Sequence, residues 1–351
     1  MKLVIATLLV TGLCGLCPAE AGKESQLGVW RVKQDFGDDG VCIVGAGALP
    51  QGETLCIPEV IGGKRVRSIA PGAFEGRGEF TGLQFPSNLI RIGENAFRRC
   101  GRLRRVIAMG GYVVALHVGS NAFSDCEQLE SIEFRRESVY LGGRSFENCG
   151  SLSQVSFNES SILTVDNAVF ANCVRLERLL LPEFVGDYVN AALLECQGLR
   201  YIGVSKDSRD YSSTGGALYN TMGDSLVRYP SVTGNDSIRI PSKVRLIYGG
   251  GLFGNQASRI ELGPRVEAIG PMAFLSCTNL TSITVPKAVK FIGERCFWNG
   301  PRLVMARFMG DAPEVDGYDI LPKECKVYVR RDAKGWDAAG WKERYEIRFL
   351  D

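Results

Sequence analysis

Apolar residues recur along most of the chain in one order, with a period of about 23 residues. The repeated unit reads Ile-Gly-x-x-Ala-Phe-x-x-Cys-x-x-Leu-x-x-Ile-x-Phe and is often followed by proline. A fixed period of this size is typical of stacked coils, because a single coil cannot bury its own apolar residues. The copies, clear and degenerate, begin at or surround Ile69, Ile92, Val118, Leu141, Val165, Leu193, Phe253, Ile269 and Ile292.

Each copy predicts the parts of one coil. Its last part, Leu-x-x-Ile-x-Phe, alternates between inward and outward residues, as a half-buried strand does. A second apolar stretch before the glycine, such as Val266–Ile269, predicts the opposite wall, and Ala-Phe-x-x-Cys predicts a short helical or tight turn. The pattern as a whole predicts a repeat solenoid: a right-handed leucine-rich-repeat superhelix, rich in β-structure, with short helical turns and about nine coils of about 23 residues.

Interruptions of the repeat divide the chain. Residues 205–243 lack the pattern and are predicted to contain a hairpin insertion, because Gly216–Tyr219 and Leu226–Pro230 flank a polar turn. In the C-terminal cap a short aromatic helix is predicted to close the last coil, with Trp336, Trp341 and Tyr345. We assign a signal peptide to residues 1–21, an N-terminal cap to 22–66, the solenoid to 67–310 and a C-terminal cap to 311–351.

The first 21 residues are typical of a secretory signal. Lys2 precedes the apolar run Leu3–Leu13, and Ala19-Glu20-Ala21 supplies small residues for cleavage. The run is too short to span a bilayer as a helix, and no later segment is long enough. We therefore expect an exported protein that is secreted, periplasmic or at the cell surface. A lipid anchor on Cys14 or Cys17 is the weaker alternative, because leucine precedes both cysteines where that processing favours a small residue.

The copies of the repeat resemble the BspA-type leucine-rich repeats of host-associated bacteria and some protozoa. The segment Gly216–Pro230 and the tail from Gly310 to Trp336 also resemble features of that family, and the resemblance covers the chain from about Ile57 onward. It implies a cell-surface or secreted binding protein, associated with adhesion to host matrix proteins and with contacts between microbes. No ligand-contacting motif carries over residue by residue.

Catalytic chemistry is scarce in the sequence. His117 is the one histidine, and with no second histidine neither a histidine-based zinc site nor a serine–histidine triad is easy to build. No P-loop, Rossmann glycine motif or Gly-x-Ser-x-Gly occurs. The net charge of +2 gives no basic face of the kind that nucleic acid requires. We predict a protein that is not an enzyme, needs no cofactor or metal, and does not bind nucleic acid.

The cysteines follow the repeat. The chain has 12, of which Cys14 and Cys17 fall in the predicted signal. Cys42 and Cys56 fall in the N-terminal cap, where a disulfide is one alternative in an oxidising compartment. Cys296 replaces the alanine before Phe297 and is predicted to be core. A small apolar side chain that recurs once per coil predicts a buried stacking ladder, which consists of Cys100, Cys126, Cys149, Cys173, Cys196 and Cys277.

The outward strand positions are the candidate binding surface. Most are small or polar, but Leu180 and Tyr201 are predicted to lie side by side on adjacent coils, beside Arg178. Arginine, aromatic and apolar residues together are typical of a binding hot spot. The alternative is that the hairpin packs over them. The candidate ligand-binding residues are Arg105, Ile107, Arg178, Leu180 and Tyr201.

Three functions remain open from the sequence. The first is protein–protein interaction or host adhesion through the strand positions. The second is binding of an anionic partner, such as a sulfated glycan, by an arginine patch that would otherwise be a solvated face. The third is a pocket for a small apolar ligand near the hairpin. The arginine patch comprises Arg98, Arg99, Arg102, Arg104, Arg135 and Arg136.

Overall fold

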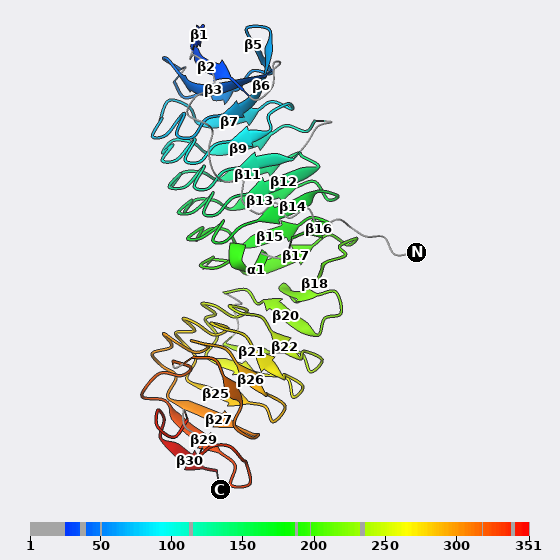
Figure 1. The fold of residues 1–351 in the computed structure, drawn as a ribbon, viewed down its shortest axis with the longest axis vertical. Helices are drawn as coiled ribbons and strands as arrows, with labels where there is room; N and C mark the ends of the chain where they lie inside the picture. Colours follow the sequence, from blue (N-terminus) through cyan, green and yellow to red (C-terminus); the bar gives the residue numbers. More distant parts are fainter. Residues whose placement is uncertain are drawn as a thin grey trace.

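Each repeat contributes one strand to each of two walls, which stack into the elongated solenoid of Figure 1. The structure is a computed structural model that describes residues 25–35, 40–49, 51–111, 115–186, 189–196, 198–231, 236–317, 319–337 and 341–350. The predicted signal peptide lies outside these residues. Among them, no helix is long and apolar enough to cross a membrane.

The first wall contains the Leu-x-x-Ile-x-Phe strands, and we call its outward side the strand face. In the described part of the chain it has 13 strands, one for each turn of the solenoid. They are β4 (Thr54–Cys56), β7 (Gly82–Phe85), β9 (Arg105–Ala108), β11 (Ser131–Phe134), β13 (Gln154–Phe157), β15 (Arg178–Leu181), β17 (Tyr201–Val204), β21 (Ser237–Arg239), β23 (Arg259–Glu261), β25 (Ser282–Val285), β27 (Met305–Phe308), β29 (Lys326–Val329) and β30 (Ile347–Phe349).

The second wall runs behind the first. It begins with the antiparallel strands β1 to β3 and continues with parallel strands, apart from β5, which pairs antiparallel with β6. Its strands are β1 (Ser25–Leu27), β2 (Trp30–Gln34), β3 (Gly40–Ala46), β5 (Val60–Ile61), β6 (Lys64–Ile69), β8 (Arg91–Ile92), β10 (Leu116–Val118), β12 (Ser138–Leu141), β14 (Ile162–Val165), β16 (Phe184–Val185), β20 (Ser225–Arg228), β22 (Leu246–Ile247), β24 (Ala268–Ile269), β26 (Phe291–Ile292) and β28 (Glu314–Val315).

The solenoid therefore has about 13 turns, and the prediction of nine is wrong. The predicted short helical turns are also wrong, because the only helix in the described residues is α1 (Val189–Ala192). The Ala-Phe-x-x-Cys segment forms a tight turn instead. Asn121 and Asp125, on either side of Phe123, have φ of 55° and 61°, which a right-handed helix of L-residues does not contain. The backbone N–H groups of Asn121 and Phe123 donate to the next coil instead of within the turn.

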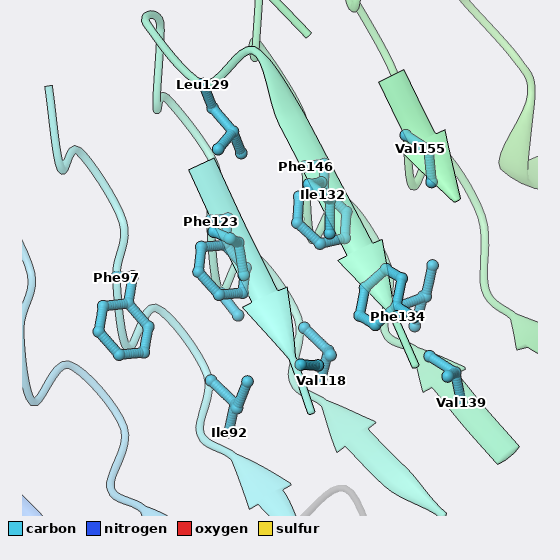
Figure 2. Close-up of a cluster of buried hydrophobic side chains, with 14 of the residues drawn as sticks. Ile92, Phe97, Val118, Phe123, Leu129, Ile132, Phe134, Val139, Phe146 and Val155 are labelled. Carbon is cyan, nitrogen blue, oxygen red and sulfur yellow. The ribbon is translucent and has the colours of Figure 1, made fainter. Parts of the chain in front are cut away.

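Two side-chain ladders fill the space between the walls. The rings of Phe97, Phe123 and Phe146 stack with centroids 5.3 and 5.2 Å apart, and Figure 2 shows them beside the inward side chains of the strands. All six cysteines of the repeat slot are buried, which confirms the predicted ladder. Each thiol also donates to a backbone carbonyl of the preceding coil, as Cys149 Sγ does to Phe123 O at 3.2 Å.

The insertion forms an antiparallel meander of β18 (Tyr211–Thr214), β19 (Ala217–Asn220) and β20. The predicted hairpin corresponds to β19 and β20. Because β20 pairs in parallel with β22, the meander continues into the second wall of the C-terminal half.

Two expectations for the caps are corrected. Cys42 is buried in β3 and Cys56 is exposed in β4, on opposite walls, so no disulfide joins the two. The predicted aromatic helix is a set of turns in its described part, because residues 338–340 lie outside the described residues and 341–344 form a turn. Trp336 and Trp341 nevertheless close the last coil by packing on Phe308, with ring centroids 4.9 and 5.2 Å away.

Candidate functional site

A shallow groove hollows the strand face between β9 and β15. In-register parallel pairing places outward residues of successive strands in columns: Arg105 lies opposite Ser131, and Ser131 lies opposite Gln154. The column through Ser131 and Gln154 is therefore uncharged in the middle of the groove, while the neighbouring column carries Glu133 opposite Ser156. The lining residues are Arg104, Arg105, Glu130, Ser131, Ile132, Glu133, Ser153, Gln154, Val155, Ser156, Arg175, Glu177, Arg178 and Leu180.

The structure brings together three of the predicted ligand-binding residues at the C-terminal end of this groove. Arg178 and Tyr201 are register partners on β15 and β17, and the Arg178 guanidinium carbon lies 4.2 Å from the centre of the Tyr201 ring. Leu180 is opposite Gly203 and is 58% exposed. We call Arg178, Leu180 and Tyr201 the β15–β17 cluster.

Gly203 makes the cluster compact. A Cβ atom at this position would lie 2.7 Å from Leu180 Cδ2 and 2.9 Å from Tyr201 Cε1. A side chain at position 203 would therefore displace the ends of the leucine and tyrosine side chains. The sequence indicated that Leu180 and Tyr201 were neighbours, but it did not show that both approach each other over a glycine.

The hairpin covers one side of the cluster and leaves the other open. The backbone N–H of Ile202 donates to Gly216 O at 2.8 Å, and a Cβ on Gly216 would come within 2.9 Å of Tyr201 Cδ2. Tyr201 is consequently half-buried, while Leu180 stays exposed. Packing of the hairpin and an open apolar surface, which the sequence posed as alternatives, both occur.

Arg105 and Ile107 lie at the opposite end of the groove, on β9. Three strand spacings separate β9 from β15, which is about 14 Å. Arg105 Nη2 is 3.7 Å from Glu133 Oε2, and Ile107 is half-buried. Arg105 therefore lines the same groove, whereas Ile107 lies on β9 without lining it, and neither residue belongs to the β15–β17 cluster.

The predicted arginine patch requires one correction. Arg136 is buried, and it donates to Pro86 O and Ser87 O at 2.7 Å each. Removal from water lowers the pKa of this guanidinium. Arg136 ties coils together and presents no charge to a ligand.

Most of the remaining patch arginines face carboxylates. Arg98 and Arg99 share Asp125 at 3.1 and 3.6 Å, and Arg104 pairs with Glu130 at 3.2 Å. Arg135 pairs with Glu133 at 2.8 Å; the hydrogen bond from Arg135 is the main reason that the pKa of Glu133 is lowered. Arg102 Nη1 lies 3.5 Å from Gln51 Oε1 and pairs with no carboxylate of the described residues. The patch is thus largely neutralised by its own neighbours.

Three further observations concern other kinds of site. A second hollow lies at the N-terminal end of the solenoid, around Trp30, Leu55, Cys56 and Phe80. Neither hollow is lined by hairpin residues, so neither is the pocket expected there. His117 is half-buried on β10, with its ring 5.5 Å from that of Tyr140, and burial lowers its pKa. Within the described ranges, no three His, Cys, Asp or Glu residues are grouped so as to hold a metal ion.

Comparison with known proteins identifies the repeat. The model of the family described as "BspA type Leucine rich repeat region" matches six copies, at residues 54–112, 114–215 and 230–318. No curated protein matches the chain.

Solved structures share the fold at low sequence identity. The pneumococcal vaccine antigen PcpA superimposes with a TM-score of 0.67 at 17% identity, covering 95% of this chain and 100% of that one. A leucine-rich repeat protein of Eubacterium ventriosum has a TM-score of 0.57 at 18% identity, covering 86% and 76%. A leucine-rich cell-surface protein of Faecalibacterium prausnitzii has a TM-score of 0.52 at 20% identity, covering 95% and 96%.

Proposed function

The chain belongs to the BspA-type leucine-rich repeat family, and on that premise we propose that it is an exported binding protein whose strand-face groove docks a partner protein. Proteins of this class, including the solved relatives, are typically binding proteins without enzymatic activity. Two relatives are described as a vaccine antigen and a cell-surface protein, which supports an adhesion-type role outside the cytoplasm.

The β15–β17 cluster is the observation that carries the proposal. A single exposed leucine is ordinary on a protein surface. Here the leucine meets a tyrosine over a glycine, the tyrosine carries a stacked arginine, and all lie at one end of a groove. Aromatic and arginine side chains around a partly enclosed apolar surface are the residues that contribute most to binding energy at protein interfaces.

The glycan alternative receives less support. An anionic polymer requires several unpaired cations, and its affinity falls steeply with salt. Four of the six patch arginines pair with carboxylates and Arg136 is buried. Binding of a protein partner is therefore the better supported of the two functions.

The test is binding to an immobilised panel of matrix proteins and sulfated glycans at two salt concentrations, with the Leu180→Arg variant beside the wild type. Val304→Arg is the matched control, because Val304 is 55% exposed beside β27, in the C-terminal half of the molecule. We expect saturable binding to a protein that changes little with salt and is lost at least about tenfold in Leu180→Arg alone.

Circular dichroism and thermal melting establish that both variants fold. Equal binding by wild type and Leu180→Arg would contradict the proposal. So would the absence of saturable binding to every protein of the panel, or binding only to glycans with a steep salt dependence.

A further inference from the structure

Two arginines at the cluster have no carboxylate partner among the described residues. Other charged residues near them form ion pairs between neighbouring coils. Glu177 lies 3.7 Å from Arg200, and at the other end of the groove Glu130 pairs with Arg104 and Glu133 with Arg105. Arg175 and Arg178 both line the groove and are exposed, yet neither forms an ion pair. The C-terminal end of the groove therefore carries uncompensated positive charge.

Arg178 is held in place without using its hydrogen-bond donors. Its guanidinium lies over the Tyr201 ring at 4.2 Å, and stacking restricts the plane of the group while its N–H donors stay at the rim. No hydrogen bond from that guanidinium to another described residue is formed. A planar, oriented guanidinium with free donors suits bidentate recognition of a carboxylate.

The floor of the groove adds unpaired backbone groups at the same place. Backbone pairing joins β11 to β13 and β15 to β17. Among the described residues none joins β13 to β15, so the strand-face ladder is interrupted there. Backbone donors and acceptors along this break must find water or a ligand. The break lies between Gln154 and Arg178, next to the β15–β17 cluster.

We propose that the groove recognises an acidic segment of the partner protein, in which a carboxylate binds Arg175 and Arg178 and a large apolar side chain packs on Leu180 and Tyr201. This inference rests on the proposed protein-binding function and specifies its partner. Positions two residues apart on one strand are about 7 Å apart, which is the separation of Arg178 and Leu180 on β15. The acidic and the apolar residue of the partner therefore lie within about two positions of each other.

The experiment is selection of a displayed library of random short peptides on the immobilised wild-type protein. We expect the selected peptides to be enriched in Asp or Glu within about two positions of Leu, Phe or Trp. Arg175→Glu/Arg178→Glu is expected to bind these peptides at least about tenfold more weakly. Selection on this variant is expected to favour Lys or Arg beside the apolar residue.

Arg307→Glu is the matched control, because Arg307 also lies on a strand, β27, faces outward and has no carboxylate partner in the described residues. It is expected to leave binding unchanged. The inference is overturned if the selected peptides show no acidic enrichment, or if no peptide is enriched on the wild type over Arg175→Glu/Arg178→Glu. It is also overturned if Arg175→Glu/Arg178→Glu and Arg307→Glu bind the selected peptides with equal affinity. If apolar peptides without acidic residues are selected and Leu180→Arg loses them, the proposed function stands and this inference fails. If Leu180→Arg retains all selected peptides, the proposed function fails as well.

Discussion

At the scale of the residue, the cysteine slot shows how one side chain can serve two purposes in a stacked coil. Each thiol is buried, and each donates to a carbonyl of the preceding coil; Cys196 Sγ lies 3.1 Å from Phe170 O and Cys277 Sγ lies 3.2 Å from Leu252 O. Burial raises the pKa of Cys196 to about 12, and that of Cys277 to about 12. The folded solenoid therefore stabilises the protonated form of these two thiols.

These pKa shifts predict a loss of stability in alkali. A thiol in the unfolded chain ionises near pH 8.5, well below the value in the folded chain. The stability that a protonated thiol contributes is therefore complete below about pH 8.5 and is lost as the pH rises toward about 12, with a slope of up to about 1.4 kcal/mol per pH unit for each thiol.

In urea denaturation at a series of pH values from neutral to alkaline, we expect Cys277→Ala to lose free energy of unfolding less steeply with pH than the wild type. The pH slope is compared rather than the absolute stability, because alanine also removes buried volume. Parallel curves would show that the thiol is not the titrating group.

The residues of the candidate site were predictable to different extents. The meeting of Arg178, Leu180 and Tyr201 follows from in-register stacking, since residues at the same position of consecutive copies must become neighbours. The burial of Arg136 did not follow, because its carbonyl partners are 49 and 50 residues earlier in the chain. The unpaired state of Arg175 depends on side-chain geometry that no repeat pattern contains.

At the scale of the element, the strands were predicted and the turns were not. Alternation over two residues is a local property, so the exposed and buried positions of β15 and β25 follow directly from the letters. The turn carries Phe, Cys and Leu three residues apart, a spacing that also favours a helix. Its backbone groups are satisfied by the next coil, as when Phe123 N donates to Ser145 O, and this hydrogen bond exists only after stacking. The coil count failed because the caps supply β4, β29 and β30, and the segment after the meander supplies β21, without the repeat motif.

The tight turn constrains both the backbone conformation and the side-chain hydrogen bonds of Asn148. This residue has φ of 60°, its side-chain amide donates to Asp125 Oδ1 at 2.8 Å, and its carbonyl oxygen accepts from Asn172 Nδ2 at 3.0 Å. We expect Asn148→Ala to lower the free energy of unfolding by about 1–3 kcal/mol, because alanine loses both hydrogen bonds and is strained at positive φ. Asn148→Gly removes the same hydrogen bonds without that strain, so it should be about 1 kcal/mol more stable than the alanine variant. Chemical denaturation of the three proteins measures this order. If the glycine variant is no more stable than the alanine variant, backbone strain is not what selects asparagine at this position.

At the scale of the whole molecule, the meander divides the interior in two. Alternate residues of β19 and β20 point to opposite sides: Leu218 and Val227 belong to the apolar cluster of the N-terminal half, while Ala217, Tyr219 and Leu226 belong to that of the C-terminal half. The strand face is also discontinuous here, because β17 and β21 lie in separate sheets. Figure 1 shows the corresponding separation between the coils that end near β17 and those that begin at β21.

This division predicts that the solenoid unfolds in two steps. The stability of a repeat protein is approximately the sum of coil stabilities and of the interfaces between neighbours, and here one interface is a thin layer shared by two cores. Leu152→Ala in the first core and Leu280→Ala in the second remove side chains that are 0% and 1% exposed, so each is expected to cost about 2–5 kcal/mol. Hydrogen exchange measured peptide by peptide across a urea series distinguishes the halves. Leu152→Ala should lower the protection of strands up to β17, and Leu280→Ala should lower the protection of strands from β21 onward.

Leu218→Ala is a variant of the layer that the two cores share. It should increase the difference between the urea concentrations at which the two halves unfold. If all three variants lower protection equally along the whole chain, the meander transmits stability between the halves and the molecule is one cooperative unit. Two separate transitions would instead mean that the groove and its β15–β17 cluster depend on the N-terminal core for their stability, and that the C-terminal coils are free to vary without altering the binding face.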